Sequence, residues 1–190
     1  MGLKYLDLIK RCQQGDLTAF EAIVKKYQSK VLGTAYLVTK SATTAEEIAQ
    51  DTFYKVYTSI NKLKSPEAFE YWLYNIAVNL SRNAIRRKRL LTVPLKKEYK
   101  EHISSDYNTP EKELVKNETV EDIKKAIADL NERVRLSVIL KYYTGLTDQQ
   151  IANTIRCPVG TVKSRLHAAR SQLGRALGEY EIKSEGGNKR

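Results

Sequence analysis

A row of basic and hydroxyl-bearing side chains within residues 159–170 is the pattern in this sequence most suited to chemistry. Lys and Arg side chains can reach phosphates or the edge of guanine, and Ser and Thr hydroxyls can bond to phosphate or base without bulk. At helical spacing, such a row occupies the outward side of a helix that fits the major groove of DNA. The row consists of Thr161, Lys163, Ser164, Arg165, His167 and Arg170.

The elements that must position this row form a predicted helix-turn-helix over residues 147–177. Thr147 and Gln150 have the spacing of a capping box, which predicts the start of a short helix. Arg156-Cys157-Pro158 predicts a tight turn, and Pro158 suits the beginning of a second helix. An ordinary helical hairpin with a solvated basic face remains the alternative that periodicity alone leaves open. The inward-facing residues are Ile151, Ala152 and Ile155 in the first helix and Val159, Val162, Leu166, Ala169 and Leu173 in the second.

The charge of the chain is strongly positive and is divided into two blocks. The net charge is +11, of which residues 1–95 carry +7, residues 96–116 carry none and residues 117–190 carry +4. A basic excess indicates a polyanionic partner, either nucleic acid or an acidic membrane surface. A generic basic tail is disfavoured because the positive residues lie inside periodic helices and not at a terminus.

The first 95 residues read as a succession of amphipathic helices. Asp16 or Thr18 is expected to cap the second helix, and Thr44 with Glu47 has capping-box spacing for a third. Ser65-Pro66 predicts a further helix start, with Ser65 as the cap and Pro66 at the first helical position. The expected core positions are Ile48, Ala49, Phe53, Val56 and Ile60 in the third helix and Phe69, Trp72, Leu73 and Ile76 in the fourth.

The remaining pattern predicts a linker followed by further helices. Residues 96–109 are polar and turn-like, and Thr109-Pro110-Glu111 resembles a helix start. Asn131 is expected to cap a later helix that ends at Gly145. The sequence therefore predicts an all-α fold of two helical modules joined by a flexible linker, the C-terminal module a helix-turn-helix. The expected buried faces are Val120, Ile123, Ile127 and Leu130, then Val134, Val138, Ile139 and Tyr142.

No group of residues suggests a metal, cofactor or catalytic site. His102 and His167 have no Asp or Cys companions at metal-ligand spacing. Cys12 and Cys157 are too far apart to suggest a disulfide framework, and Cys157 is expected to pack and not to do redox chemistry. We therefore expect no catalytic residue, no metal and no cofactor. Without a signal peptide or an apolar run of about 18 residues, the chain is expected to be cytoplasmic, without membrane insertion.

Three stretches resemble the extracytoplasmic-function sigma factors of bacterial RNA polymerase. YYTGLTDQQIANTIRCPVGTVKSRLHAAR resembles the C-terminal module of that family. TAEEIAQDTFYKVY resembles its polymerase-binding helix, and AFEYWLYNIAVNLSRNAIRRKR resembles its promoter-melting helix. The resemblance, which covers about residues 5–95 and 109–178, implies a non-enzymatic subunit that recruits core polymerase to promoters. Its implied modules are residues 1–95 and 110–180, with a linker at 96–109 and a tail at 181–190.

The resemblance also implies roles for single residues. The helix that carries Glu47, Gln50, Asp51 and Lys55 is expected to grip a coiled coil of the largest polymerase subunit. The loop from Lys62 to Ala68 is expected to line a pocket for a flipped base, and the row within residues 159–170 to bind the minus-thirty-five element. At the minus-ten element, Asn79 and Asn83 are expected to contact unpaired bases, and the DNA backbone is expected to meet Arg82, Arg86, Arg87 and Lys88.

Two positions depart from the usual pattern of the family, and two other functions stay open. Many members have Asp where Asn83 stands and Arg where Ala168 stands, which weakens any inference about the promoter sequence. The family also implies an anti-sigma protein, membrane-linked, that sequesters the chain; unbound, the chain is expected to be a monomer. An autonomous helix-turn-helix regulator would dimerise on a palindrome. A nucleic-acid-processing enzyme would need a metal or nucleophile.

Overall fold

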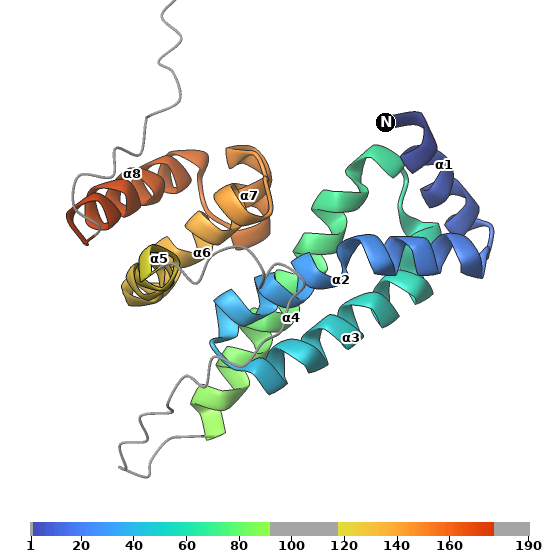
Figure 1. The fold of residues 1–190 in the computed structure, drawn as a ribbon. Helices are drawn as coiled ribbons and strands as arrows, with labels where there is room; N and C mark the ends of the chain where they lie inside the picture. The colour runs from blue at the N-terminus through green and yellow to red at the C-terminus, as the bar shows by residue number, and fades with distance from the viewer. Residues whose placement is uncertain (1, 92–117, 177–190) are drawn as a thin grey trace, which may run out of the picture. The chain divides into compact units, whose positions relative to one another are not determined.

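A computed structural model describes residues 2–91 and 118–176 (Figure 1). All the described secondary structure is helical, so the predicted all-α fold is confirmed. The chain divides into two compact units, Met1–Tyr107 and Asn108–Arg190. The predicted linker at 96–109, the predicted helix start at Thr109-Pro110-Glu111 and the tail at 181–190 lie outside the described residues. Within the described ranges, no helix is both long and apolar enough to cross a membrane.

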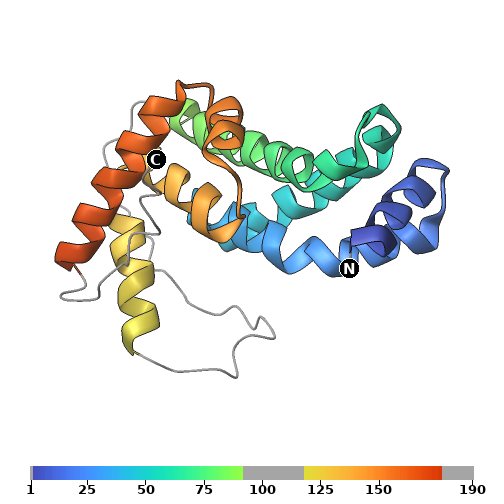
Figure 2. The same cartoon turned by 90° about the horizontal axis from the view of Figure 1, so that it is seen from above.

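The first unit is a bundle in which the second, third and fourth helices pack on one another. The first helix packs against the second, close to the turns that precede α4 (Figure 2). The core of this unit includes Ala35, Ala45 and Ile48, which join α2 to α3. The small alanine side chains there let the two helices approach closely. The helices are α1 (Gly2–Gln13), α2 (Leu17–Thr39), α3 (Ala42–Ser59) and α4 (Phe69–Leu91).

An aromatic cluster closes the end of this bundle where α4 begins. Phe69 is fully buried, and its ring centroid lies 5.8 Å from that of Tyr27 and 6.1 Å from that of Trp72. Trp72 is partly buried. These contacts confirm that Phe69 belongs to the core, where a buried aromatic ring contributes much of the hydrophobic stabilisation.

The start of α3 differs from the prediction. Thr44 does not cap the helix; Ser41 does, because its hydroxyl accepts a hydrogen bond from the Thr44 N–H at 3.4 Å. The preceding helix ends at Thr39 and is capped by Lys40, which adopts a left-handed conformation with φ of 59° and donates its N–H to the carbonyl of Tyr36. This reversal is so short that α3 begins at Ala42, two residues before Thr44.

The second unit is built around the last helix. That helix contacts α5, α6 and α7. Leu140, Ile151 and Val162 are fully buried at the centre of the unit. Asn131 caps α6 as predicted, because its side chain accepts from the Arg133 N–H. The helices are α5 (Glu118–Asp129), α6 (Glu132–Val138), η4 (Ile139–Tyr143, π-helical), α7 (Asp148–Ile155) and α8 (Val159–Ala176).

Two residues of this unit expected to be buried are exposed. Tyr142, which lies in the π-helical η4, is 56% exposed. Ile123 is 38% exposed. Leu130, just beyond α5, is buried, and the buried Arg135 guanidinium donates to the Leu130 carbonyl at 3.3 Å. Among the described residues expected on the buried face of α5, the buried one is therefore Leu130, just after the end of the helix, and not Ile123.

Candidate nucleic-acid interface

The first helix of the predicted helix-turn-helix begins with a complete capping box. The Thr147 hydroxyl accepts from the Gln150 N–H at 3.3 Å, and the Gln150 side-chain oxygen accepts from the Thr147 N–H at 2.9 Å. Both donors would otherwise lack a partner within the helix. The prediction at this site is confirmed, and it fixes where α7 begins relative to the turn.

The turn between α7 and α8 is held by backbone hydrogen bonds over a few residues. Arg156 is left-handed, with φ of 55°, and donates its N–H to the carbonyl of Ala152. The Cys157 N–H also donates to Ala152, at 3.0 Å, and the Pro158 carbonyl accepts from the Thr161 N–H at 2.9 Å. A non-glycine residue in this conformation costs about 1 kcal/mol, so the turn is fixed by its surroundings and not by Arg156 itself.

The predicted row on α8 lies opposite a buried stripe. Val162, Leu166 and Ala169 are buried, whereas Lys163, Ser164 and His167 are exposed. The other three predicted members, Thr161, Arg165 and Arg170, are partly buried along the flanks of the helix.

Arg165 has a further contact that the sequence did not indicate. Its guanidinium points back to the turn and donates to Cys157 Sγ at 3.7 Å. Gly160 and Ser171 are exposed as well, and their spacing places them on the same outward side as Ser164 and His167. Helical periodicity was the signal by which they could have been found.

The candidate DNA-contacting residues of α4 do not all share one face. Asn79 and Asn83 are exposed and one turn apart, and Arg82 and Arg86 lie on the same side. Lys88 is exposed too, but at about 3.6 residues per turn it lies on the opposite side of the helix from Asn79. Arg87 is exposed on the flank between them.

Asn75 and Tyr71 extend this face toward the start of α4. The Asn79 side-chain amide donates to Oδ1 of Asn75 at 2.5 Å. The Asn75 amide in turn donates to the Tyr71 hydroxyl at 3.4 Å. Only the spacing of four residues between the members could have indicated this chain of bonds.

The loop before α4 is anchored by a distant residue. The Gln13 side chain donates to the carbonyls of Ile60 at 3.1 Å and Leu63 at 2.7 Å. The loop contains two single 3₁₀ turns, η1 (Ile60–Lys62) and η2 (Pro66–Ala68). Pro66 does stand at a first helical position, but it is that of η2, and the Ser65 side chain makes no capping bond. The long helix therefore begins at Phe69.

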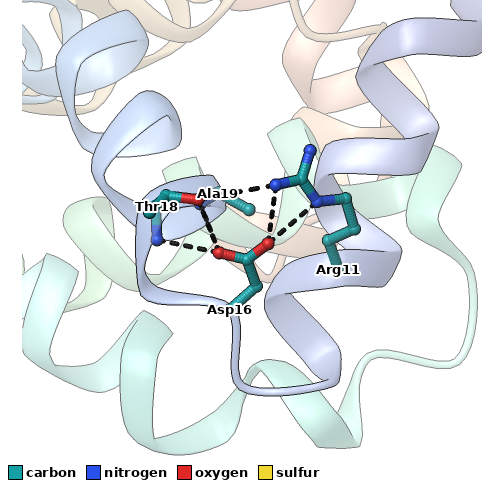
Figure 3. A network of polar contacts seen from close by, with 4 residues as sticks. All are labelled: Arg11, Asp16, Thr18 and Ala19. Carbon is teal, nitrogen blue, oxygen red and sulfur yellow. Dashed lines mark hydrogen bonds and ion pairs between the residues drawn. The ribbon is translucent and has the colours of Figure 1, made fainter.

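A network of hydrogen bonds at Asp16 fixes the turn between α1 and α2, directly after Gln13 (Figure 3). The Asp16 carboxylate accepts from the backbone N–H groups of Thr18 and Ala19 at the start of α2. It also accepts from the Arg11 guanidinium, at 2.9 and 2.7 Å. The hydrogen bonds from the Thr18 hydroxyl, the Ala19 N–H and the Arg11 guanidinium hold the pKa of the Asp16 carboxyl well below its usual range. Of the two predicted caps, Asp16 is the one used.

The polar side of α3 is exposed as expected. Glu47, Gln50, Asp51 and Lys55 are all solvent-accessible. Tyr54 lies on the same side and is 69% exposed. A large aromatic residue within a polar face is a common feature of protein-binding surfaces.

Comparisons with known proteins agree with this division of the chain. Residues 23–90 match the sigma-70 region 2 family and residues 121–173 match the sigma-70 region 4 family. The chain is 34% identical over 177 residues to the RNA polymerase sigma-H factor of Pseudomonas aeruginosa, covering 90% of this chain and 92% of that protein. An ECF RNA polymerase sigma-E factor of Haemophilus influenzae is also 34% identical, covering 87% and 91%. The chain belongs to the extracytoplasmic-function (ECF) sigma factors.

A solved structure shares the fold of this sigma factor. RpoE from Bartonella quintana, solved in complex with the anti-sigma factor NepR, has a TM-score of 0.65 at 22% identity. The alignment covers 83% of this chain and 96% of that one.

As an ECF sigma factor, the protein is a transcription initiation factor that directs core RNA polymerase to specific promoters. It recognises minus-thirty-five and minus-ten elements and assists promoter melting. Region 2 falls within the first unit and region 4 within the second, so the candidate residues of α3 and α4 belong to region 2 and those of α8 to region 4.

The described part of this sigma factor contains no group of three or more His, Cys, Asp or Glu side chains arranged to hold a metal ion. Burial raises the pKa of the Cys12 thiol to about 11, and the Asp16 carboxylate adds to that shift. The thiol is therefore protonated at neutral pH and a poor nucleophile. Cys157 is a free thiol that is partly buried in the turn.

Proposed function

We propose that region 4 binds the minus-thirty-five element through the outward side of α8. The observation that supports this assignment is the exposed row of Lys163, Ser164 and His167 opposite the buried stripe, directly after a rigid turn. The partly buried members of the row lie along its edges and extend it toward the two DNA strands; they are Thr161, Arg165 and Arg170. The row fits the major groove because its central side chains are short or positively charged.

In region 2, the proposed minus-ten reader is the exposed side of α4. Asn79 and Asn83 present amides that can bond to the Watson–Crick edges of unpaired bases. Their neighbours on the helix contact the DNA backbone, and the loop Lys62 to Ala68 holds a flipped base. The backbone-contacting residues are Arg82, Arg86, Arg87 and Lys88, of which Lys88 reaches the DNA from the other side of the helix.

The proposed contact with core polymerase is the polar side of α3. It presents Glu47, Gln50, Asp51 and Lys55, which are exposed together along the helix. Neither unit offers many phosphate contacts, so each is expected to bind free DNA weakly and with strong salt dependence. Holding both units on one polymerase raises their effective concentration at the promoter.

In this proposal, core polymerase catalyses RNA synthesis. The sigma factor works as a non-enzymatic subunit in the cytoplasm, without a metal or a cofactor. The proposed boundaries remain residues 1–95 and 110–180 around a linker at 96–109, with a tail at 181–190. Without a partner, the sigma factor is expected to be a monomer. We also expect an anti-sigma protein to sequester it away from the polymerase, since RpoE from Bartonella quintana is solved with NepR. On family grounds that partner is expected to be membrane-linked.

The test is run-off transcription with core polymerase on promoters with and without a minus-thirty-five element. Lys163→Ala is expected to weaken promoters that depend on this element and to reduce the slope of binding against salt by about 1. Lys25→Ala is the matched control, because Lys25 is exposed on α2 and its loss removes the same charge. Loss of polymerase binding in Lys163→Ala, or an equal defect in Lys25→Ala, would contradict the assignment.

A further inference from the structure

Three polar side chains form a hydrogen-bonded ladder along the exposed side of α4. They are Tyr71, Asn75 and Asn79, each one helical turn after the last. Asn75 is partly buried and stands in the middle, accepting from the Asn79 amide at 2.5 Å and donating to the Tyr71 hydroxyl at 3.4 Å. Asn79 is exposed at the end of the ladder. Among the described residues, none donates to its carbonyl oxygen.

In the ladder, the Asn79 amide is held with its NH₂ group toward Asn75. A free asparagine amide rotates between two nearly equivalent orientations, which exchange its oxygen and its NH₂ group. Because Nδ2 of Asn79 donates to Asn75, the NH₂ group faces the beginning of α4 and the carbonyl oxygen faces away from it. The second N–H of the Asn79 amide and its carbonyl oxygen remain available to a ligand. The N–H lies nearer the beginning of α4 and the oxygen lies farther from it.

A fixed order of donor and acceptor divides the four bases into two classes. Adenine and cytosine present an amino donor beside a ring-nitrogen acceptor on the Watson–Crick edge. Guanine and thymine present a carbonyl acceptor beside a ring N–H donor. An amide that turns freely can pair with either class, whereas a fixed amide meeting a base from one direction pairs well with one class only.

We propose that Asn75 is a positioning residue that fixes the Asn79 amide, so that Asn79 separates amino bases from keto bases at one unpaired position of the minus-ten element. The inference rests on the proposed placement of Asn79 against a base and goes beyond it by assigning a role to Asn75 and a form to the discrimination. The partly buried Tyr71 anchors the far end and limits the rotation of the Asn75 amide.

A purely structural ladder makes a different prediction. If the bonds only stabilised α4, then Asn75→Ala would change the stability of the helix and not the choice of base. Alanine has the highest helix propensity, so the variant is expected to keep α4 folded. The discriminating measurement is therefore a ratio between bases and not the total amount of transcript.

The experiment measures run-off transcription by core polymerase with the full chain on promoters that carry each base at each minus-ten position. At one position the native chain is expected to favour one class over the other. Loss of a single orienting hydrogen bond in Asn75→Ala is expected to reduce that ratio by about threefold to tenfold. Binding to core polymerase, measured in parallel, is expected to stay at the native level.

Three further variants complete the test. Asn75→Asp keeps an acceptor for the Asn79 amide and is expected to retain the ratio, even if its charge lowers total transcription. Tyr71→Phe removes only the far anchor and is expected to have a smaller effect. In an Asn79→Ala background, Asn75→Ala is expected to cause no additional change in the ratio, because its effect passes through Asn79.

The outcomes distinguish the two levels of the proposal. If Asn79→Ala abolishes the ratio and Asn75→Ala preserves it, the positioning role is wrong while the minus-ten assignment of Asn79 stands. If Asn79→Ala leaves every base ratio at the native value, both the assignment and the inference drawn from it are wrong. A preference at the Asn79-dependent position that separates purines from pyrimidines would also overturn the inference.

Discussion

The two segments of this sigma factor that precede its proposed DNA-reading helices are held in opposite ways. In region 2, the loop before α4 is anchored by Gln13, which lies 47 and 50 residues away from its two acceptors. In region 4, the turn before α8 is held by Ala152, by Thr161 and by the contact from Arg165 to Cys157. The turn is thus held by contacts from residues close to it in the sequence, whereas the loop depends on how another helix packs.

This difference links the loop of region 2 to the beginning of the chain. Gln13 is the last residue of α1, and the turn that follows is fixed by the Asp16 network. A change at that turn can therefore alter the loop, although the two are far apart in sequence. Among the described residues, no side chain as distant in sequence donates or accepts a hydrogen bond at the turn of region 4.

The largest effects are expected from removing the central side chain of each unit. Phe69→Ala is expected to cost about 3–5 kcal/mol and Ile151→Ala about 2–5 kcal/mol of unfolding free energy, because both side chains are fully buried. If the units are stabilised separately, each substitution lowers protection against amide hydrogen exchange in its own unit only.

Hydrogen-exchange mass spectrometry on the full chain makes this comparison. Phe69→Ala is expected to leave α6, α7 and α8 as protected as in the native chain, and Ile151→Ala is expected to leave α2 and α3 protected. If either variant loosens both units equally, the two units are stabilised jointly. The loop of region 2 and the turn of region 4 could then not be treated as separately supported.

Gln13→Ala is the direct test of the distant support. It removes two hydrogen bonds to the loop, at about 1 kcal/mol each, and leaves the Ile60 and Leu63 carbonyls without this partner. Faster amide exchange in residues 60–68 and weaker promoter melting are expected, with unchanged dependence on the minus-thirty-five element. Gln14→Ala is the matched control, since Gln14 is exposed beside it. Equal effects of the two variants would exclude the anchoring role.

Thr147→Ala tests the local support in region 4. Loss of the capping box is expected to cost about 1 kcal/mol and to loosen α7, the helix that leads into the turn. Thr147→Ser keeps the hydroxyl and is expected to retain most of that stability. Chemical unfolding followed by circular dichroism measures both variants, and a serine variant as unstable as the alanine one would show that the hydroxyl is not the source.

The sequence-based predictions were accurate mainly where residues close in sequence set the geometry. The capping box of α7, the turn at Arg156-Cys157-Pro158 and the buried stripe of α8 are confirmed, because spacing within a few residues determines them. The anchor from Gln13 could not be predicted, since only tertiary packing brings it to the loop. The exposure of Tyr142 was not predicted either, and a regular helical period does not anticipate the π-helical segment that contains this residue.

Acidification is expected to affect the Asp16 network before it affects the capping box of α7. The folded-state pKa of Asp16 is lowered, so its stabilising contribution is fully present above the unfolded value of about 4. The contribution is lost progressively as the pH falls through the folded value. Asp16→Asn keeps an acceptor but does not titrate. The stability difference between the native chain and this variant should therefore shrink as the pH falls below about 4, and a constant difference would contradict the role of the charge.

The smallest effect separates the observed cap of α3 from the predicted one. Ser41→Ala is expected to cost about 0.5–1 kcal/mol, near the lower end for an N-cap, because the bond from the Thr44 N–H is long at 3.4 Å. Thr44→Ala is expected to change stability by less, since Thr44 donates only its backbone N–H to the cap and its hydroxyl is not required. Thermal unfolding of the two variants in parallel decides between them. A greater loss in Thr44→Ala would restore the cap inferred from spacing, and with it the view that region 2 is specified as locally as region 4.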